Sequence, residues 1–258
     1  MMVKEKTNNT LIKVEGLKLA YGSHIVLEKI NFEVEQGRCL VVMGGSGCGK
    51  STLLKSMVGL LPPINGNVVI DGEDLWCDQI TKNNLVLRKL GVLFQGGALW
   101  SSMTVEENVA LPMQIFTDLS QREVVDLVSY KLGLVGLQGA GGFYPSELSG
   151  GMRKRAGLAR AMALDPDILF LDEPSAGLDP ITSKRLDDLI NELKESLGIS
   201  LIVVTHELAS IYEIADDSIF LDAETKVILA KGKPENMING DFDPKVKNFL
   251  KRGLIEQN

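Results

Sequence analysis

This sequence of 258 residues has few cysteines, no long apolar run and no excess of basic charge. Its three cysteines, Cys39, Cys48 and Cys77, cannot all pair and show no CxxC spacing. This argues against a disulfide scaffold or a cysteine-rich zinc site and favours a reducing compartment. The apolar runs, such as residues 40–43 and 201–204, are far shorter than the roughly 20 residues of a membrane helix. The polar start also lacks the apolar segment of a secretory signal, so we expect a cytoplasmic chain without a membrane anchor of its own.

The charge balance is acidic, with 27 Lys and Arg residues against 34 Asp and Glu residues and a net charge of −7. That balance argues against broad binding of nucleic acid, and no nucleic-acid partner is expected. The 45% of hydrophobic residues is ordinary for a globular protein, so a chain of this length can bury a core without disulfide or metal cross-links.

Strand and helix patterns alternate along most of the chain. Buried or half-buried strands are predicted within 11–36, at 39–43, near 68–70, and at 92–94, 168–171 and 199–204, with a helix at about 51–60. A second helix begins at Asp179 and Pro180, carries an apolar face of Leu186, Leu189, Ile190, Leu193 and Leu197, and stops at Gly198. Residues 104–164 show helical patterns and few strand signals. This order predicts a mainly parallel α/β sheet with a helical insertion.

The strongest motif is GGSGCGKS at residues 44–51, which matches GxxxxGK[ST] between a predicted strand and a predicted helix. Glycines allow successive backbone N–H groups to turn toward phosphates, and the helix N-terminus adds partial positive charge. Lys50 is expected to reach the β and γ phosphates of a nucleotide, and the Ser51 hydroxyl to bind Mg²⁺. The alternative is a glycine-rich turn with an exposed lysine. The candidate nucleotide-binding residues are Gly44, Gly45, Ser46, Gly47, Cys48, Gly49, Lys50, Ser51 and Thr52.

Two further motifs supply acidic residues and a second anion site. Asp172 and Glu173 directly follow the predicted strand 168–171. Asp172 is expected to hold Mg²⁺, and Glu173 to polarise the attacking water. The alternative for this acidic pair is a solvated helix cap. Ser149, Gly150 and Gly151 open a helix and form another anion-binding nest. Two such nests would crowd the phosphates of one nucleotide in a small domain, so a second copy of the chain is the expected source of the second nest.

Taken in order, these motifs resemble the ATP-binding subunits of ABC transporters over about residues 11–240. The resemblance implies a RecA-like P-loop NTPase core, mainly parallel with an antiparallel β portion, and an inserted α-helical subdomain at about 96–164. It also implies residues 1–10 as an N-terminal extension and 241–258 as a C-terminal tail. ATP and Mg²⁺ are the implied substrate and cofactor, and two ATP molecules would lie in a head-to-tail dimer between the phosphate-binding loop of one copy and the LSGG signature of the other.

The resemblance assigns roles to four residues that would be unremarkable alone. Gln95 becomes a ligand of Mg²⁺ and water, His206 a γ-phosphate sensor, Tyr21 the aromatic that stacks on adenine, and Asp179 part of the D-loop at 175–179. A plain loop glutamine, a structural strand-end histidine and a core aromatic are the alternatives for the first three. The signature departs from the usual LSGGQ at Met152, which cannot donate the amide hydrogen bond of glutamine, while Ser149 and the glycine amides remain.

Four segments resemble the ATPases of Mla-type, Mce-linked phospholipid transporters of Gram-negative envelopes: residues 148–155, 93–99, 173–182 and 243–250. This subgroup implies transmembrane permease subunits, an Mce-domain lipid-binding subunit and a small accessory subunit as partners, at the cytoplasmic face of the inner membrane. An ATPase for import of amino acids or another small solute is the alternative, since such ATPases share every catalytic motif. A non-transport ABC ATPase is a remote alternative, because the chain has one motif set and no heptad run or cysteine cluster.

Overall fold

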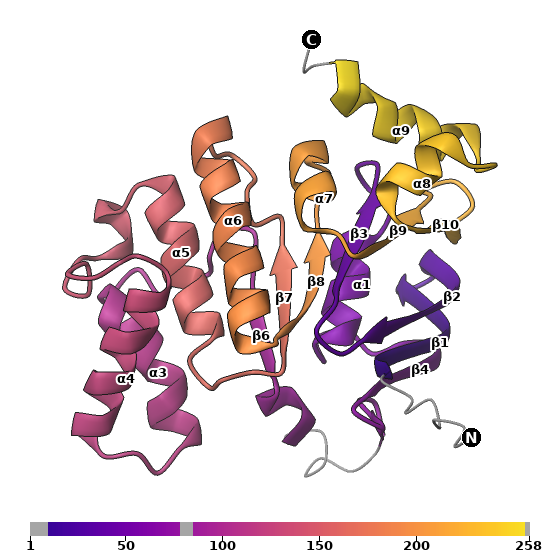
Figure 1. The fold of residues 1–258 in the computed structure, drawn as a ribbon. Helices are drawn as coiled ribbons and strands as arrows, with labels where there is room; N and C mark the ends of the chain where they lie inside the picture. Colours follow the sequence, from indigo (N-terminus) through magenta and orange to yellow (C-terminus); the bar gives the residue numbers. More distant parts are fainter. Residues whose placement is uncertain (1–9, 78–84, 256–258) are drawn as a thin grey trace, which may run out of the picture.

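Two sheets form the body of the molecule in the computed structural model, which describes residues 10–77 and 85–255 (Figure 1). The first is antiparallel, in the order β2-β1-β4-β5, from β1 (Thr10–Tyr21), β2 (His24–Glu35), β4 (Asn65–Ile70) and β5 (Glu73–Asp74). The second has the order β10-β9-β3-β8-β7-β6, from β3 (Cys39–Gly44), β6 (Leu90–Leu93), β7 (Ile168–Asp172), β8 (Ser200–Val204), β9 (Asp217–Leu221) and β10 (Ile228–Gly232). All its pairs are parallel except β9 with β10, which confirms the predicted fold class.

The three central strands of the large sheet place the functional segments at one edge. Every residue of β3, β7 and β8 is buried, as their continuous apolar runs predict for strands covered on both faces. Val203 pairs with Val41 on one side and with Leu171 on the other. The carboxyl ends of these parallel strands therefore meet, and the segments that follow Gly44, Asp172 and Val204 emerge side by side.

A helical layer lies beyond β6, formed by α3 (Val105–Phe116), α4 (Gln121–Leu134) and α5 (Gly150–Ala161), with a short 3-10 turn at Pro145–Glu147 (Figure 1). Two glycines allow α5 to pack closely on β6. A Cβ on Gly91 would lie 2.2 Å from the Ala161 carbonyl oxygen, and one on Gly157 would lie 2.7 Å from a Leu93 methyl. Helix α5 thus links the helical layer to the sheet edge where the site forms.

Helix α6 (Pro180–Leu197) begins and ends as its sequence predicts. The Asp179 carboxylate accepts from the amides of Ile181 at 3.1 Å and Thr182 at 3.0 Å, and Gly198 leaves the helix with φ +66°. The buried face includes Leu186, Ile190 and Leu193. The prediction is wrong for Leu197, which is 42% exposed in the last turn, where the chain already turns away at Gly198.

The C-terminal segment folds back onto the sheet through α7 (Leu208–Ile214), α8 (Pro234–Asn239) and α9 (Pro244–Ile255). Val246 and Leu250 of α9 are fully buried, and the Phe249 ring meets Phe220 edge to face at 5.3 Å. The Tyr212 hydroxyl donates to the Leu250 carbonyl oxygen at 3.2 Å. The division at residues 10 and 240 stays a prediction, and its residues 1–9 and 256–258 lie outside the described chain. Within the described ranges, no helix has the length and apolar character to cross a bilayer.

Replacing Leu250 by alanine is expected to lower the free energy of unfolding by about 2–4 kcal/mol, because it leaves a cavity under α9. Urea unfolding followed by circular dichroism measures this change. Asn248→Ala, on the exposed side of the same helix, is the matched control and should change stability by less than about 0.5 kcal/mol. A Leu250→Ala protein as stable as the control would mean that α9 is not part of the core.

Candidate active site

A cavity of about 830 Å³ opens at the sheet edge where the central strands end. It is lined by the complete loop 44–52 and by side chains from four other segments: His24 and Val26 of β2, Gln95 after β6, Glu173 after β7, and His206, Leu208 and Phe249 from the C-terminal part. Residues as far apart in the sequence as His24 and Phe249 thus surround one space, and most of the predicted nucleotide-binding set is among them.

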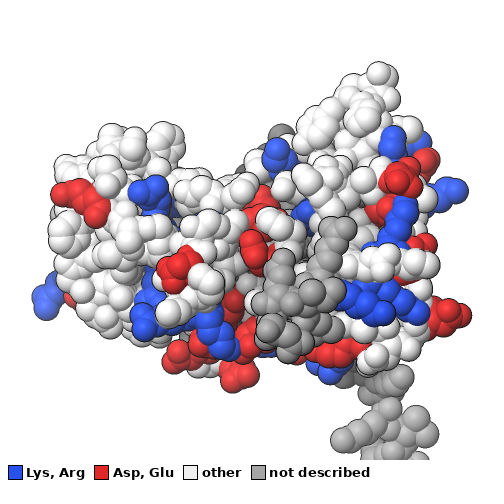
Figure 2. Space-filling model, turned by 90° about the horizontal axis from the view of Figure 1, so that it is seen from above, with Lys and Arg blue, Asp and Glu red and all other residues white. Residues whose placement is uncertain are grey.

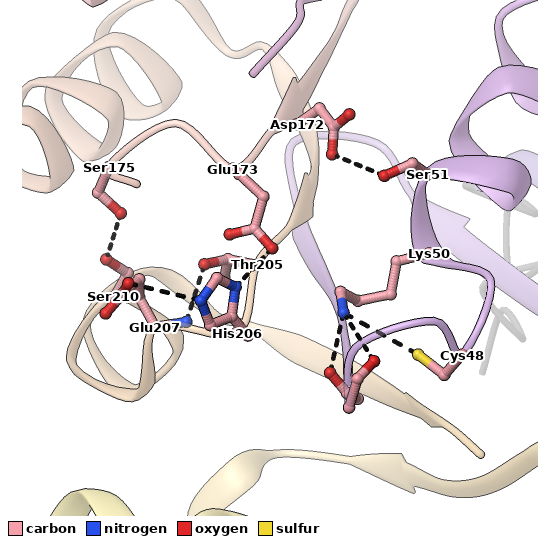
Figure 3. A network of polar contacts seen from close by, with 12 residues as sticks. Cys48, Lys50, Ser51, Asp172, Glu173, Ser175, Thr205, His206, Glu207 and Ser210 are labelled. Carbon is pink, nitrogen blue, oxygen red and sulfur yellow. Dashed lines mark hydrogen bonds and ion pairs between the residues drawn. The ribbon is translucent and has the colours of Figure 1, made fainter. Parts of the chain in front are cut away.

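The loop between β3 and α1 (Lys50–Met57) has the backbone of a phosphate cradle. Gly44, Gly47 and Gly49 all have positive φ, at 148°, 76° and 99°. A Cβ on Gly44 would lie 2.4 Å from the Leu221 carbonyl oxygen, so this position accepts glycine alone without movement of the strand. The Lys50 ammonium folds over the loop and donates to the carbonyl oxygens of Gly44 at 2.9 Å and Gly45 at 3.1 Å (Figure 3).

The Cys48 side chain is buried and belongs to the hydrophobic core beside the loop. Its Sγ would lie 2.7 Å from a Cβ on Gly44 and lies 4.0 Å from Lys50 Nζ (Figure 3). Burial raises the pKa of this thiol, and the nearby Lys50 charge opposes the rise only in part. The residue therefore contributes its backbone to the loop, while its sulfur fills space.

Iodoacetamide at neutral pH is expected to modify Cys48 of the folded chain at least about tenfold more slowly than in urea, because a buried thiol of raised pKa forms little thiolate. Peptide mapping by mass spectrometry gives the rate at each cysteine, and the half-buried Cys77 serves as the internal reference. Equal rates at Cys48 and Cys77 in the folded protein would contradict the assigned burial.

Two oxygen donors stand where a magnesium ion is predicted. The Ser51 hydroxyl lies 3.3 Å from Asp172 Oδ1, and Gln95 lines the same cavity (Figure 3). Burial raises the pKa of Asp172, and the hydrogen bond from Ser51 partly offsets the rise. A hydroxyl, a carboxylate and an amide oxygen fit Mg²⁺, which takes few protein ligands and completes its shell with phosphates and water. Over the described chain no cluster of three His, Cys, Asp or Glu residues is placed to hold a metal ion.

The side chains of Glu173 and His206 contact one another just beyond the carboxyl ends of β7 and β8. His206 Nδ1 lies 2.7 Å from Glu173 Oε1, and because a carboxylate can only accept, Nδ1–H is the donor (Figure 3). Glu173 Oε2 is buried and has no hydrogen-bond partner among the described residues. The hydrogen bond to Oε1 thus orients the carboxylate, and Oε2 is left available to a ligand. Glu173 also has φ +49°, a left-handed conformation that is strained for a residue with a side chain.

A buried lysine that sequence reasoning missed links three segments of the site. Lys154 of α5 donates through Nζ to the backbone carbonyl oxygen of Gln95 and, at 2.8 Å, to that of Glu173. Burial lowers the pKa of Lys154, whereas the carboxylates of Glu173 and Asp172 oppose this shift. Its position one helical turn after Gly150 was the available signal, because that spacing places both residues on one face of α5.

Several predicted residues lie outside this cavity. Ser149 caps α5 by accepting from the Met152 amide at 3.2 Å, and a Cβ on Gly151 would lie 2.6 Å from a Thr182 methyl, so the signature packs against the start of α6. Asp179 is engaged as the α6 cap, and Tyr21 is 49% exposed at the end of β1. Neither the signature residues nor Tyr21 line the cavity, and their assigned roles stay predictions.

A second carboxyl, Asp187 of α6, is buried outside the cavity. It is 2% exposed, accepts from the Ser210 hydroxyl at 2.7 Å, and keeps Oδ1 without a hydrogen-bond partner in the described chain. The nearby charges are Lys184 and Asp188 on its own helix and Glu213 on α7, and Lys184 pairs with both acidic groups. Burial raises the pKa of Asp187 to about 6.

This raised pKa predicts that the chain loses stability as the pH rises from about 4 to about 6, because the folded state holds the Asp187 proton more tightly than the unfolded state. Asp187→Leu removes the group, so its stability relative to the parent should improve by about 2–3 kcal/mol between pH 4 and pH 7.5. Urea unfolding at both pH values measures the change. Asp188→Leu, which removes the exposed neighbouring carboxylate, is the control. A pH-independent difference for Asp187→Leu would show that Asp187 does not hold its proton in the fold.

The chain is similar to known proteins along most of its length. A family model described as ABC transporter matches residues 27–176. The intermembrane phospholipid transport system ATP-binding protein MlaF of Haemophilus influenzae is 41% identical over 245 residues, which cover 95% of this chain and 91% of that protein. The probable ribonucleotide transport ATP-binding protein mkl of Mycobacterium tuberculosis is 40% identical over 240 residues, covering 93% of this chain and 66% of that protein.

A solved structure has a similar fold. The dimeric post-hydrolysis state of the ATP-binding cassette MJ0796 bound to ADP and phosphate is 28% identical to this chain, with a TM-score of 0.79 over 86% of this chain and 98% of that one. The two-sheet body and the helical layer therefore occur together in a protein whose structure holds a hydrolysed nucleotide.

Proposed function

The chain belongs to the ABC transporter family, and from that membership we propose that it is the ATP-hydrolysing subunit of a phospholipid transporter. The observation that carries the substrate class is the 41% identity to a phospholipid transport ATPase along almost the full length of both chains. The relative named for ribonucleotide transport is nearly as identical, but this chain spans only 66% of it. An importer ATPase for a small solute is the second candidate.

Binding of ATP rests on the loop at residues 44–52. Its backbone N–H groups and the α1 N-terminus face the phosphates, and the Lys50 ammonium exchanges the Gly44 and Gly45 carbonyl oxygens for phosphate oxygens. Ser51, Asp172 and Gln95 would hold Mg²⁺, which neutralises phosphate charge when bound. Tyr21 stacks on the adenine, a contact that favours purines without strong base selectivity.

Hydrolysis rests on Glu173 and His206. The free Oε2 of Glu173 accepts a proton from water, the water oxygen bonds to the γ-phosphorus, and the bond to the β–γ bridging oxygen breaks to give ADP and phosphate. His206 holds the carboxylate through Oε1 and lies where its ring reaches the γ-phosphate. Positioning and electrostatics supply the rate enhancement.

A second copy of the chain completes each site. Ser149, Gly150 and Gly151 lie outside the cavity of their own chain, which fits a role on the ATP of the partner copy, and Asp179 stands beside them at the start of α6. The dimeric state of the MJ0796 cassette supports this arrangement. ATP then joins the two copies, and hydrolysis releases them.

The membrane-spanning work falls to partners. Permease subunits contact the helical layer and the Gln95 segment. An Mce-domain subunit and a small accessory subunit complete the transporter. The chain sits at the cytoplasmic face of the inner membrane. Figure 2 views the edge where the central strands end, and Lys and Arg there are interspersed with Asp and Glu, with wide areas carrying neither.

Purification of the tagged chain with its membrane partners and reconstitution into vesicles tests the proposal. The ATPase rate and the transfer of fluorescent phospholipid are measured together, with ribonucleotide and amino-acid uptake as parallel assays. ATP-dependent phospholipid transfer that stops in a Glu173→Gln complex is expected. Uptake of a ribonucleotide or an amino acid, without lipid transfer, would overturn the substrate class and leave the ATPase assignment standing.

A further inference from the structure

Two side-chain contacts join the segment after β7 to the segment that runs from β8 into α7, and the proposed catalysis uses only one of them. The Glu173–His206 contact faces the nucleotide cavity. Ser175 follows Glu173 by two residues and Ser210 lies in α7, and their hydroxyls point at one another with the oxygens 3.1 Å apart (Figure 3). The second contact lies outside the nucleotide cavity and ties segments 173–175 and 206–210 together.

The segment after β7 needs such support because Glu173 is strained. Its left-handed conformation, φ +49°, persists only where the surroundings hold it. The Glu173 amide donates to the Val204 carbonyl oxygen at 2.8 Å and fixes the entry to the turn. On the exit side, after Pro174, Ser175 is the next residue with a polar side chain, and that side chain is buried. Its hydroxyl is therefore placed to fix the exit.

The contact of Ser210 with Asp187 determines which of the two serine hydroxyls is the hydrogen-bond donor. Ser210 Oγ–H donates to Asp187 Oδ2 at 2.7 Å, so the single hydroxyl proton of Ser210 is used and its oxygen accepts from Ser175. The resulting chain runs from Ser175 through Ser210 to Asp187, and all three residues are buried. Linked hydrogen bonds in a buried site polarise and strengthen one another.

We propose that Asp187 and Ser210 are positioning residues that hold Ser175, and through it the strained turn at Glu173, in the geometry in which Glu173 meets His206. A buried carboxyl with one unpartnered oxygen is costly, and an apolar side chain of the same shape would be cheaper at this point of α6. Its hydrogen bond to Ser210, and through Ser210 to Ser175, gives a functional reason to keep a carboxyl here. The inference rests on the proposed function, because it presumes ATP hydrolysis at Glu173.

The test compares four variants by steady-state Mg²⁺-ATPase assays, well below the unfolding temperature. Asp187→Leu keeps the branching of the side chain and removes the acceptor, and should lower kcat about tenfold, the rate equivalent of one lost hydrogen bond, with KM for ATP within about twofold of the parent. Asp187→Asn keeps an acceptor oxygen and should stay within about threefold in kcat. Ser175→Ala removes a single hydroxyl and should match Asp187→Leu. Asp188→Leu, the exposed neighbour, should match the parent.

Combining Ser175→Ala with Asp187→Leu should lower kcat no further than either change alone, because both act on one chain of contacts. Parental kcat in Asp187→Leu and Ser175→Ala would overturn the proposal, and so would an Asp187→Asn as slow as Asp187→Leu or a multiplicative loss in the double variant. A parent chain and complex without Mg²⁺-dependent ATPase activity would instead refute the proposed function itself.

Discussion

Glu173→Gln is expected to lower kcat for ATP hydrolysis by about 10²–10⁴-fold while nucleotide affinity stays within about twofold. The change is nearly isosteric and keeps an oxygen opposite His206, but it removes the free carboxylate oxygen that takes the proton from water. The phosphate-binding loop is untouched, so ATP still binds and the closed dimer accumulates. Single-turnover hydrolysis and fluorescent-nucleotide titration measure the two quantities separately.

Glu207→Gln is the matched control for this change. Its carboxylate stands beside the other nitrogen of the same histidine, at 3.7 Å from His206 Nε2, and is largely exposed. Turnover in Glu207→Gln should stay within about threefold of the parent. Parental turnover in Glu173→Gln would refute the role of Glu173 as the proton acceptor.

Lys50→Ala is expected to weaken ATP binding by at least about 100-fold, because charge-assisted hydrogen bonds of about 1.5–3 kcal/mol to the phosphates are lost. The remaining loop keeps its glycine backbone, so the fold survives and the effect is confined to the nucleotide. Isothermal titration with ATP and with ADP gives the affinities.

Lys55→Ala, at an exposed position one turn further along α1, is the control and should bind ATP as the parent does. Thermal unfolding of both variants separates a loss of affinity from a loss of structure. Unchanged ATP affinity in a folded Lys50→Ala protein would remove the basis for the phosphate-loop assignment.

The parts of the site that could be predicted are those in which a short stretch of sequence favours one backbone conformation. The glycines of 44–49 can occupy positive φ where other residues are strained, and the apolar runs before Gly44 and Asp172 can only be covered strands. Parallel pairing then brings Lys50 and Glu173 together without further information. The motif order carried the family resemblance, which the comparisons confirm.

The parts that escaped prediction depend on contacts between distant segments. Lys154 and Asp187 look like ordinary solvated charges in their helices, and only the packing of α5 and α6 against the catalytic loops buries them. Leu197 is the opposite case: the sequence pattern places it on the apolar face of α6, but it is exposed because the helix ends there. Strand β4 starts at Asn65, before the predicted 68–70, because a register shift in β1 lets the ladder extend to Lys18 opposite Asn65.

The measurement that tests the central claim most directly is the mass of the Glu173→Gln chain in solution, by light scattering, with ATP and with ADP. Each active site is complete only when a second copy brings its signature, so ATP should convert the monomer to a dimer and ADP should not. Adding Ser149→Arg, which places a bulky charge at the signature, should abolish the dimer while ATP still binds the monomer. A Glu173→Gln chain that binds ATP yet stays monomeric, or a dimer that Ser149→Arg leaves intact, would contradict the account.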